Sequence, residues 1–463
     1  MKHKLLYTAF FILLLQNSFS QTVSLDPTFG TGGEVINNSI TSGQAIQLQS
    51  DGKIVSCYLS SYSTSGNIHL TRLNSDGSID AAFGVNGFVN TILFSEVGGL
   101  NMMKMQSDGK IVITGDLYSS GNGGYNFATT RLNSDGTIDT TFGVSGYAIT
   151  DFGTFNGDFS NTIEIQNDGK ILVGGYTNQT NLDVALVRYL SNGTVDTTFG
   201  ISGKFTYNFG TNTIPLHGGI SNDEVIAIRV NSLGKIILGI YTDVNESSVD
   251  YANFGFVCLN ANGTLDASFG SNGQTIVDFG DKDYIANLTL TADDKIIATG
   301  RHQYAVGANN YNNIPLVKLL QNGNYDTSFG NNGIVLTNRD SSNLTDISND
   351  LYIQSDGKII CFGATPDPTN SRANFLLIRF NTDGTIDSSF NNVGYKSVDF
   401  NTSNAIGTSF LIQNDDKILC AGSVNNYSAG CLARLQMDNL ATNTLTNKSF
   451  SIYPNPFSES ITI

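Results

Sequence analysis

One unit of about 60 residues recurs seven times along this chain of 463 residues. Its first signature is the step "FG" or a near relative of it, and its second is a turn that reads "QSDGKII" or similar. The two signatures alternate without exception from about residue 25 to residue 435. A period of this length is typical of repeat architectures, in which each unit buries its apolar surface against the next unit. The fold must therefore be one that a single short unit can build by repetition.

Each unit contains four short segments with strand-forming sequences. In the third unit these segments are "GYAITDF", "NTIEIQ", "KILVGGY" and "DVALVRYL", and Gly, Asn or Asp separates them. Apolar and β-branched residues stand at near-alternate positions, whereas helical spacing is absent. Four antiparallel strands in each of seven units predict an all-β fold, a seven-bladed β-propeller. A parallel β-helix is the main alternative, but its coils are much shorter than sixty residues.

The composition limits the possible partners. The net charge of −16 and the absence of a Lys/Arg cluster make nucleic acid an unsuitable partner. The five cysteines are odd in number and widely scattered, so they form no disulfide framework. Cys420 and Cys431 could face each other across one hairpin, but buried free thiols are the preferred interpretation.

The N-terminal segment predicts export. Residues 1–20 contain Lys2 and Lys4, then an apolar run, then small residues, which is the pattern of a secretory signal peptide cleaved after Ser20. The apolar run is too short to span a bilayer, so the mature chain should carry no transmembrane segment. We expect a secreted or surface-attached protein of a Gram-negative bacterium.

The repeats resemble the delta-60 repeat family, whose signature combines "LNSDGTIDTTFG" with "QSDGKI". The resemblance covers residues 21–435, although the fourth unit has Leu233 where the others have Asp. It implies a propeller fold and no known catalytic activity. After a polar linker at 436–448, the segment 449–463 contains "YPNP" and resembles the start of a C-terminal sorting domain of the type IX (Por) secretion system of Bacteroidetes-type bacteria. That resemblance implies the secretion machinery as a partner if the domain is complete.

The stretch "LNSDGTIDTTFGVSG", residues 132–146, has the polar residues of a metal or phosphate site. In the register of an EF-hand loop, however, Arg131 and Phe142 would take the first and last ligand positions, which excludes that loop. A Walker loop is excluded because Gly169-Lys170 is followed by Ile171 and opens a strand. A looser calcium site stays an alternative. With both loop types excluded, no metal and no cofactor are expected.

Seven-fold repetition indicates a structural role for this stretch. An Asp three places before the Phe can accept backbone hydrogen bonds and fix the turn. The Phe would fill the space between adjacent blades, and a cation at the end of six fourth strands could pair with the Asp. The aspartates are Asp26, Asp80, Asp139, Asp196, Asp266, Asp326 and Asp387. The phenylalanines are Phe29, Phe83, Phe142, Phe199, Phe269, Phe329 and Phe390. The cations are Arg72, Arg131, Arg188, Lys318, Arg379 and Arg434.

Catalytic motifs are missing from the sequence. It contains no HExxH, no GxSxG and no Cys/His ligand spacing, and it lacks Trp, a common platform for sugar rings. We therefore expect no enzyme, but a binding or structural module for a protein or a glycan. The alternative is a secreted hydrolase whose acidic residues lie on the face with variable loops.

Strand direction places the two signatures on one regular face and the variable loops on the opposite face. The variable loops include 119–126, 211–222, 243–253 and 302–315. Binding residues are common in such loops on a fixed scaffold, although tolerated surface insertions explain them equally well. The candidate binding residues are His217, Tyr251, His302, Tyr304 and Tyr311.

Overall fold

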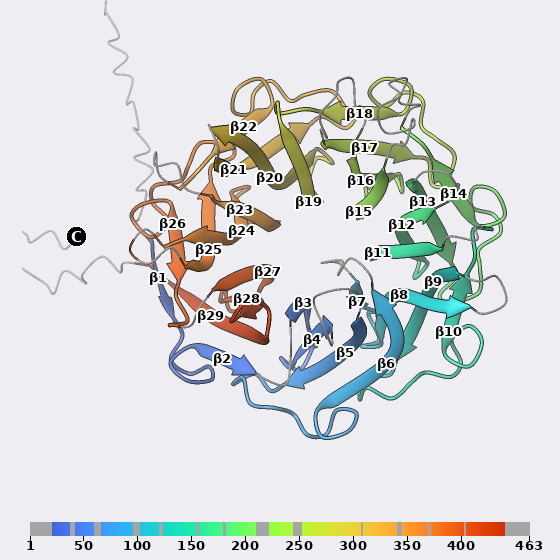
Figure 1. Ribbon diagram of the computed structural model, residues 1–463, viewed down its shortest axis with the longest axis horizontal. Helices are drawn as coiled ribbons and strands as arrows, with labels where there is room; N and C mark the ends of the chain where they lie inside the picture. Colours follow the sequence, from blue (N-terminus) through green and yellow to red (C-terminus); the bar gives the residue numbers. More distant parts are fainter. Residues whose placement is uncertain are drawn as a thin grey trace, which may run out of the picture.

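The computed structural model confirms the seven-bladed β-propeller. Four-stranded antiparallel blades stand around a common axis, and none of the described residues is helical (Figure 1). The structure describes residues 21–37, 42–59, 66–95, 102–119, 124–153, 157–178, 182–209, 222–243, 252–306, 309–339, 345–367, 369, 372–401 and 404–439.

The strands fall into four positions, counted outward from the axis. The innermost strands are β3 (Ser42–Leu48), β7 (Met103–Met105), β11 (Asp158–Ile165), β15 (Asp223–Val230), β19 (Lys282–Leu290), β23 (Ile347–Ile353) and β27 (Ala405–Ile412). The second strands are β4 (Ile54–Leu59), β8 (Ile111–Ser119), β12 (Ile171–Asn178), β16 (Ile236–Thr242), β20 (Ile296–Val306), β24 (Ile359–Pro366) and β28 (Ile418–Val424). The third strands are β5 (Gly66–Leu73), β9 (Gly124–Leu132), β13 (Leu182–Tyr189), β17 (Asn253–Leu259), β21 (Asn309–Leu319), β25 (Ala373–Phe380) and β29 (Ala429–Asn439). The outer strands are β6 (Phe88–Ser95), β10 (Tyr147–Thr150), β14 (Lys204–Tyr207), β18 (Gln274–Val277), β22 (Ile334–Thr337), β26 (Tyr395–Val398) and, for the last blade, β2 (Glu34–Asn37).

Blades and sequence repeats are offset by one strand. The first strand of the third repeat, β10, pairs with β9 of the preceding unit, with Tyr147 opposite Thr130. A blade therefore consists of three strands from one repeat and an outer strand that follows the next "FG" step. Periodicity alone shows the length of the unit but not where a blade begins.

The N-terminal strands close the ring. Both β1 (Gln21–Leu25) and β2 pair with β29, so the last blade combines the two ends of the propeller (Figure 1). Val23 lies opposite Met437 in this pairing, and Val35 lies opposite Leu432.

The core consists of seven separate clusters, each between two adjacent blades. One of them joins Val112 and Phe127 of the second blade to Ile163 and Val173 of the third. Each second strand packs against the neighbouring blades on both of its faces. All six residues of β4 are therefore buried. This explains why the second strands carry apolar runs without alternation.

Candidate functional site

The repeated Asp and Phe residues lie in joints between blades on the regular face, and Asp139 shows the geometry. Its Oδ1 accepts hydrogen bonds from Thr141 N (3.1 Å) and Oγ1 (2.6 Å). Its Oδ2 accepts from Nε of Arg131 and from Nζ of Lys110, each at 2.7 Å. Burial alone would raise the pKa of Asp139, but these hydrogen bonds and the charge of Arg131 hold it well below its usual range. Both oxygens of the carboxylate therefore accept hydrogen bonds from groups of its own blade.

Phe142 fills the space between two blades. Its side chain is completely buried, and the guanidinium carbon of Arg131 lies 4.8 Å from the ring centroid. The ring packs so closely on Gly193 of the next blade that a Cβ added there would lie 2.9 Å from it. Nη1 of Arg131 donates a hydrogen bond to the carbonyl of Ser191 in the next blade (2.6 Å).

All seven joints contain the buried phenylalanine and the aspartate, but two of them lack the arginine. The seven phenylalanines are no more than 1% exposed, and five arginines hold their aspartate through Nε at 2.7–2.9 Å. Lys318 lies 3.8 Å from Asp326. In the fourth blade Cys258 takes the place of the cation, and only Lys235 pairs with Asp266, at 2.6 Å. Each joint aspartate thus lies next to at least one cation of its own blade.

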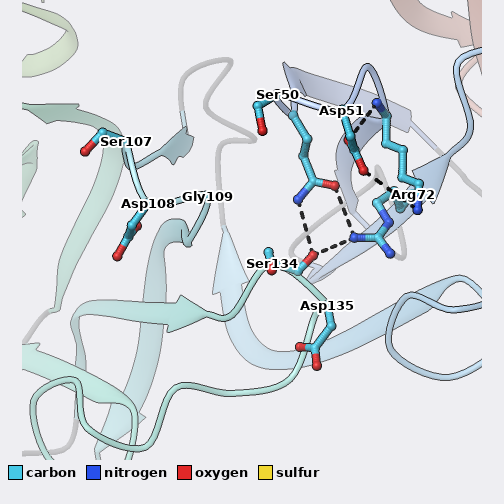
Figure 2. A pocket seen from close by; sticks show the side chains of 10 residues that line it. Ser50, Asp51, Arg72, Ser107, Asp108, Gly109, Ser134 and Asp135 are labelled. Atoms are coloured by element: carbon cyan, nitrogen blue, oxygen red, sulfur yellow. Dashed lines mark hydrogen bonds and ion pairs between the residues drawn. The ribbon is translucent and has the colours of Figure 1, made fainter.

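A pocket of about 440 Å³ lies on the same regular face, between the first and second blades. Its wall contains Arg72, whose Nη1 donates to Oε1 of Gln49 and to the carbonyl of Ser134; Figure 2 shows Arg72 beside Ser134. The carboxylates of Asp51 and Asp108 each accept a backbone N–H of their own turn. No motif in the sequence predicted this pocket. Among the described residues no group of side chains has the arrangement of a metal site.

A second repeated aspartate lies on the opposite face, where the inner strand begins in four blades. Each of these side chains is fully buried, and its Oδ2 accepts a backbone N–H from the segment before the strand at 2.7–3.0 Å. In three blades Oδ1 accepts the hydroxyl of a threonine on the second strand, at 2.5–2.6 Å. The aspartates are Asp158, Asp223, Asp283 and Asp346, and the threonines are Thr177, Thr242 and Thr365.

The fifth blade departs from this pattern, because His302 stands where the other three blades have threonine. Nδ1 of His302 lies 2.7 Å from Oδ1 of Asp283, so Asp283 fixes the ring and its tautomer. Burial raises the pKa of Asp283, against the hydrogen bonds from His302 and from Phe279 N–H. The other ring nitrogen, Nε2, has no partner among the described residues. This pair has the components of an acid–base group.

A long hairpin extends beyond His302, whose side chain is itself buried. Strands β20 and β21 have eleven residues each and remain paired to Val306 and Asn309. The rings of His302 and Tyr304 stack, with their centroids 5.8 Å apart and their planes at 12°. The ring centroid of Tyr311 lies 5.9 Å from that of Tyr304. The prediction of a loop at 302–315 is therefore wrong, since most of that segment is strand.

The structure thus brings together three of the five candidate binding residues. His302, Tyr304 and Tyr311 form one aromatic row, whereas His217 and Tyr251 lie outside the described residues. The sequence did hold a signal for Asp283, because each Asp of this set stands twelve residues before the turn lysine, and its partner stands seven residues after that lysine. Alignment of the units on that lysine shows His302 as the exception.

Five segments of the chain match the family model described as "Domain of unknown function (DUF5122) beta-propeller", namely residues 49–83, 106–142, 166–199, 234–269 and 354–390. The chain is a β-propeller repeat protein. Every matched segment ends on a joint phenylalanine and contains the turn, two strands and the joint. The narrower resemblance to delta-60 repeats and to a sorting domain stays a prediction. No curated protein matches the chain.

Solved structures similar to this propeller include carbohydrate-active enzymes. A PL25 polysaccharide lyase, an ulvan lyase bound to -[GlcA(1-4)Rha3S]-, is 11% identical, with a TM-score of 0.50 over 89% of this chain and 94% of that one. The polysaccharide lyase Uly1 is 12% identical, with a TM-score of 0.45 over 86% and 90%. The GH93 α-L-arabinofuranosidase of Fusarium graminearum, in complex with arabinobiose, is 10% identical, with a TM-score of 0.38 over 90% and 97%.

These neighbours correct one prediction. The expectation that the propeller is not an enzyme is contradicted, because the fold it shares with the ulvan lyase carries catalysis there. At 11% identity the likeness shows the fold alone, so it transfers no activity to this chain. The missing motifs are no ground for exclusion either, because a fold can bring together acid–base residues that form no motif in the sequence. No helix long and apolar enough to cross a membrane occurs in the part of the chain that the structure describes.

Proposed function

We propose that this propeller is an exported protein that binds a glycan at the hairpin of the fifth blade. The observation that carries the proposal is the row of His302, Tyr304 and Tyr311 on two strands that extend from the variable face. Aromatic faces pack well against the C–H faces of sugar rings, and their polar atoms bind hydroxyls. The exposed Asn309 and Asn310 at the tip add amides that donate and accept.

The charge of the chain indicates which class of glycan this surface can bind. The tip carries neutral amides, and the chain has a net charge of −16, which repels polyanions. A neutral polysaccharide is therefore the ligand that fits this surface. Arg301 does not change this assignment, because it points to the other side of β20, with its guanidinium carbon 4.1 Å from the ring centroid of Tyr284.

The test is binding of neutral polysaccharides by the full chain and by the Tyr304→Ala variant. We expect the variant to bind about tenfold more weakly, the size of one aromatic stacking contact. Tyr118→Ala is the matched control, because Tyr118 also faces a tyrosine, Tyr125, across a hairpin, with the centroids at 5.4 Å. Equal binding by the wild type, Tyr304→Ala and Tyr118→Ala would contradict the site.

Hydrolysis of the bound glycan is a second candidate function, with Nε2 of His302 as general base. Two features favour it: Nε2 has no partner among the described residues, and the buried Asp283 lies behind Nδ1, so that a carboxylate supports one ring nitrogen while the other can take up a proton. The sharpest variant is His302→Thr, because threonine fills the same position in three blades and keeps Asp283 hydrogen-bonded. If the proposal holds, His302→Thr keeps its melting temperature and loses the release of reducing ends. Unchanged release by this variant would contradict a role in turnover.

Export is the third part of the proposal, and the sequence of residues 1–20 supports it. Fractionation of cells that produce the full chain tests it, together with the N-terminal sequence of the product. Protein that stays in the cytoplasm with Met1 or Lys2 at its N-terminus would contradict export.

A further inference from the structure

The seventh joint is built differently from the other six. In six joints the backbone N–H after the phenylalanine donates to a carbonyl in a turn of the next blade, at 2.7–2.8 Å. In the seventh joint the last blade has no such turn, because β29 runs on past Leu435 to pair with β1. There Asn391 N–H donates to the carbonyl of Gln21 instead, at 2.6 Å.

The side chain of Gln21 also takes part in this joint. In other joints Nη1 of the arginine donates to a carbonyl of the next blade, such as that of Ser134 or Ser191. In the seventh joint Nη1 of Arg379 donates to Oε1 of Gln21 at 2.6 Å. The N–H of Gln21 donates to the carbonyl of Ser389 at 2.9 Å. One residue thus replaces a whole turn.

We propose that Gln21 becomes the first residue of the mature protein and is modified there to pyroglutamate. The inference rests on the export part of the proposed function, with cleavage after Ser20. In the modification the terminal amine nitrogen attacks Cδ of its own side chain, the Cδ–Nε2 bond breaks, and Nε2 leaves as ammonia. The product is a lactam, and the step needs no oxidant or reductant.

The surroundings of Gln21 favour the lactam over a free amine. A free amine would place a positive charge on the nitrogen that contacts Ser389, and Nη2 of Arg379 lies 3.3 Å from Oγ of that same serine. The nearby carboxylate, Asp387, already pairs with Arg379 at 2.8 Å and with Lys358 at 2.9 Å. A free amine would therefore add a third cation beside two that already share one carboxylate, in a site where Arg379 is buried.

The lactam also retains the donor and acceptor groups that make the contacts of Gln21. It retains one N–H, which can donate to the carbonyl of Ser389, and one carbonyl oxygen from the former side chain, which can accept from Arg379. Its backbone carbonyl is unchanged and still accepts from Asn391. Only the charge is lost.

The first experiment is intact mass and N-terminal sequencing of the protein after export from cells that make the full chain. We expect a chain that begins at residue 21, is blocked to sequencing, and is lighter by one ammonia than the unmodified chain. A chain that begins at residue 21 with a free amine would overturn the modification and leave export intact. A chain that begins elsewhere would overturn the cleavage after Ser20 and the modification with it.

The second experiment measures the consequence for the ring. The mature chain is prepared with an unmodified Gln21, and one half is treated with a glutaminyl cyclase. We expect a higher melting temperature for the treated half. Gln21→Ser, which cannot cyclise, is the matched control and should show no change with treatment. An equal melting temperature for the treated and untreated wild type would overturn the proposed role of the lactam in ring closure.

Discussion

At the scale of single residues, the joint aspartate combines a turn and a salt bridge in one side chain. Oδ1 of Asp139 fixes the backbone of its own turn, while Oδ2 holds the two cations. The sequence predicted the aspartate and the phenylalanine, because both recur at fixed spacing. It did not predict that Lys110 belongs to the joint, since that lysine lies 29 residues before Asp139 in another turn. Only the fold brings the two turns together.

Loss of a joint phenylalanine should destabilise the ring without affecting a ligand site. For Phe142→Ala we expect the free energy of unfolding to fall by about 3–5 kcal/mol, because the vacated space lies between two rigid sheets and cannot collapse. Denaturant unfolding measures this change. Val144→Ala is the control, because Val144 lies two residues further on and is 81% exposed. An unchanged melting temperature for Phe142→Ala would contradict the role of the ring as a filler between blades.

At the scale of elements, two segments differ from what the sequence predicted. The segment 302–315 reads as a loop because four asparagines disfavour a strand. It is nevertheless a hairpin, since pairing continues from a fully buried strand pair that sets the register. The site on it could have been predicted only in part: the aromatic residues stand out, but the contact of His302 with Asp283 requires the pairing of β19 with β20.

The other segment is β1. The sequence placed it in the propeller but did not show that it pairs with β29. Deletion of residues 21–25 should lower the free energy of unfolding by more than about 3 kcal/mol, because Val23 is 3% exposed in the last cluster and the seventh joint loses Gln21. Calorimetry of the truncated and the mature chain measures this change. A Thr22→Ala/Ser24→Ala double variant removes only hydrogen bonds of exposed groups of the same strand and should cost less than about 1 kcal/mol. Similar effects of the deletion and of this control would argue against closure by β1.

At the scale of the whole molecule, the seven-fold repeat made the architecture predictable. It did not show at which strand of the repeat each blade begins. Any set of four consecutive strands satisfies the period, so only strand pairing decides that β10 belongs with β9. The same limit applies to the ring as a whole, because β1 and β2 pair with β29 across 393 to 418 residues of sequence.

Because joint aspartates act together around the ring, the whole propeller should be acid-sensitive. Burial would raise the pKa of Asp196, but bonds from Thr198 and the charges of Arg188 and Lys170 lower it to about 2. Bonds from Lys235 and Ser268 likewise lower the pKa of Asp266 to about 2. A folded pKa below the usual 3.8 means that the unfolded chain binds protons first as the pH falls. The stabilisation is therefore complete above about pH 5 and is lost between about pH 4 and 2.

Melting temperatures measured from pH 7 to pH 2 test this expectation. The Asp196→Asn variant should be less stable at pH 7 and should lose less stability than the wild type toward pH 2, because one of the titrating joints is gone. A wild-type melting temperature that stays constant down to pH 2 would contradict the linkage.

The offset between repeat and blade has a consequence for how such a chain can change its size. Each blade borrows its outer strand from the following repeat, and in six of the seven joints the carbonyl that accepts the N–H comes from the blade after it. A duplication or loss of one repeat, cut anywhere in the unit, therefore leaves every internal blade with a complete set of strands. Only β1, which includes Gln21, has a position that no other repeat can supply. Recombination between repeats can thus lengthen or shorten the gene while the two chain ends remain the closing pair.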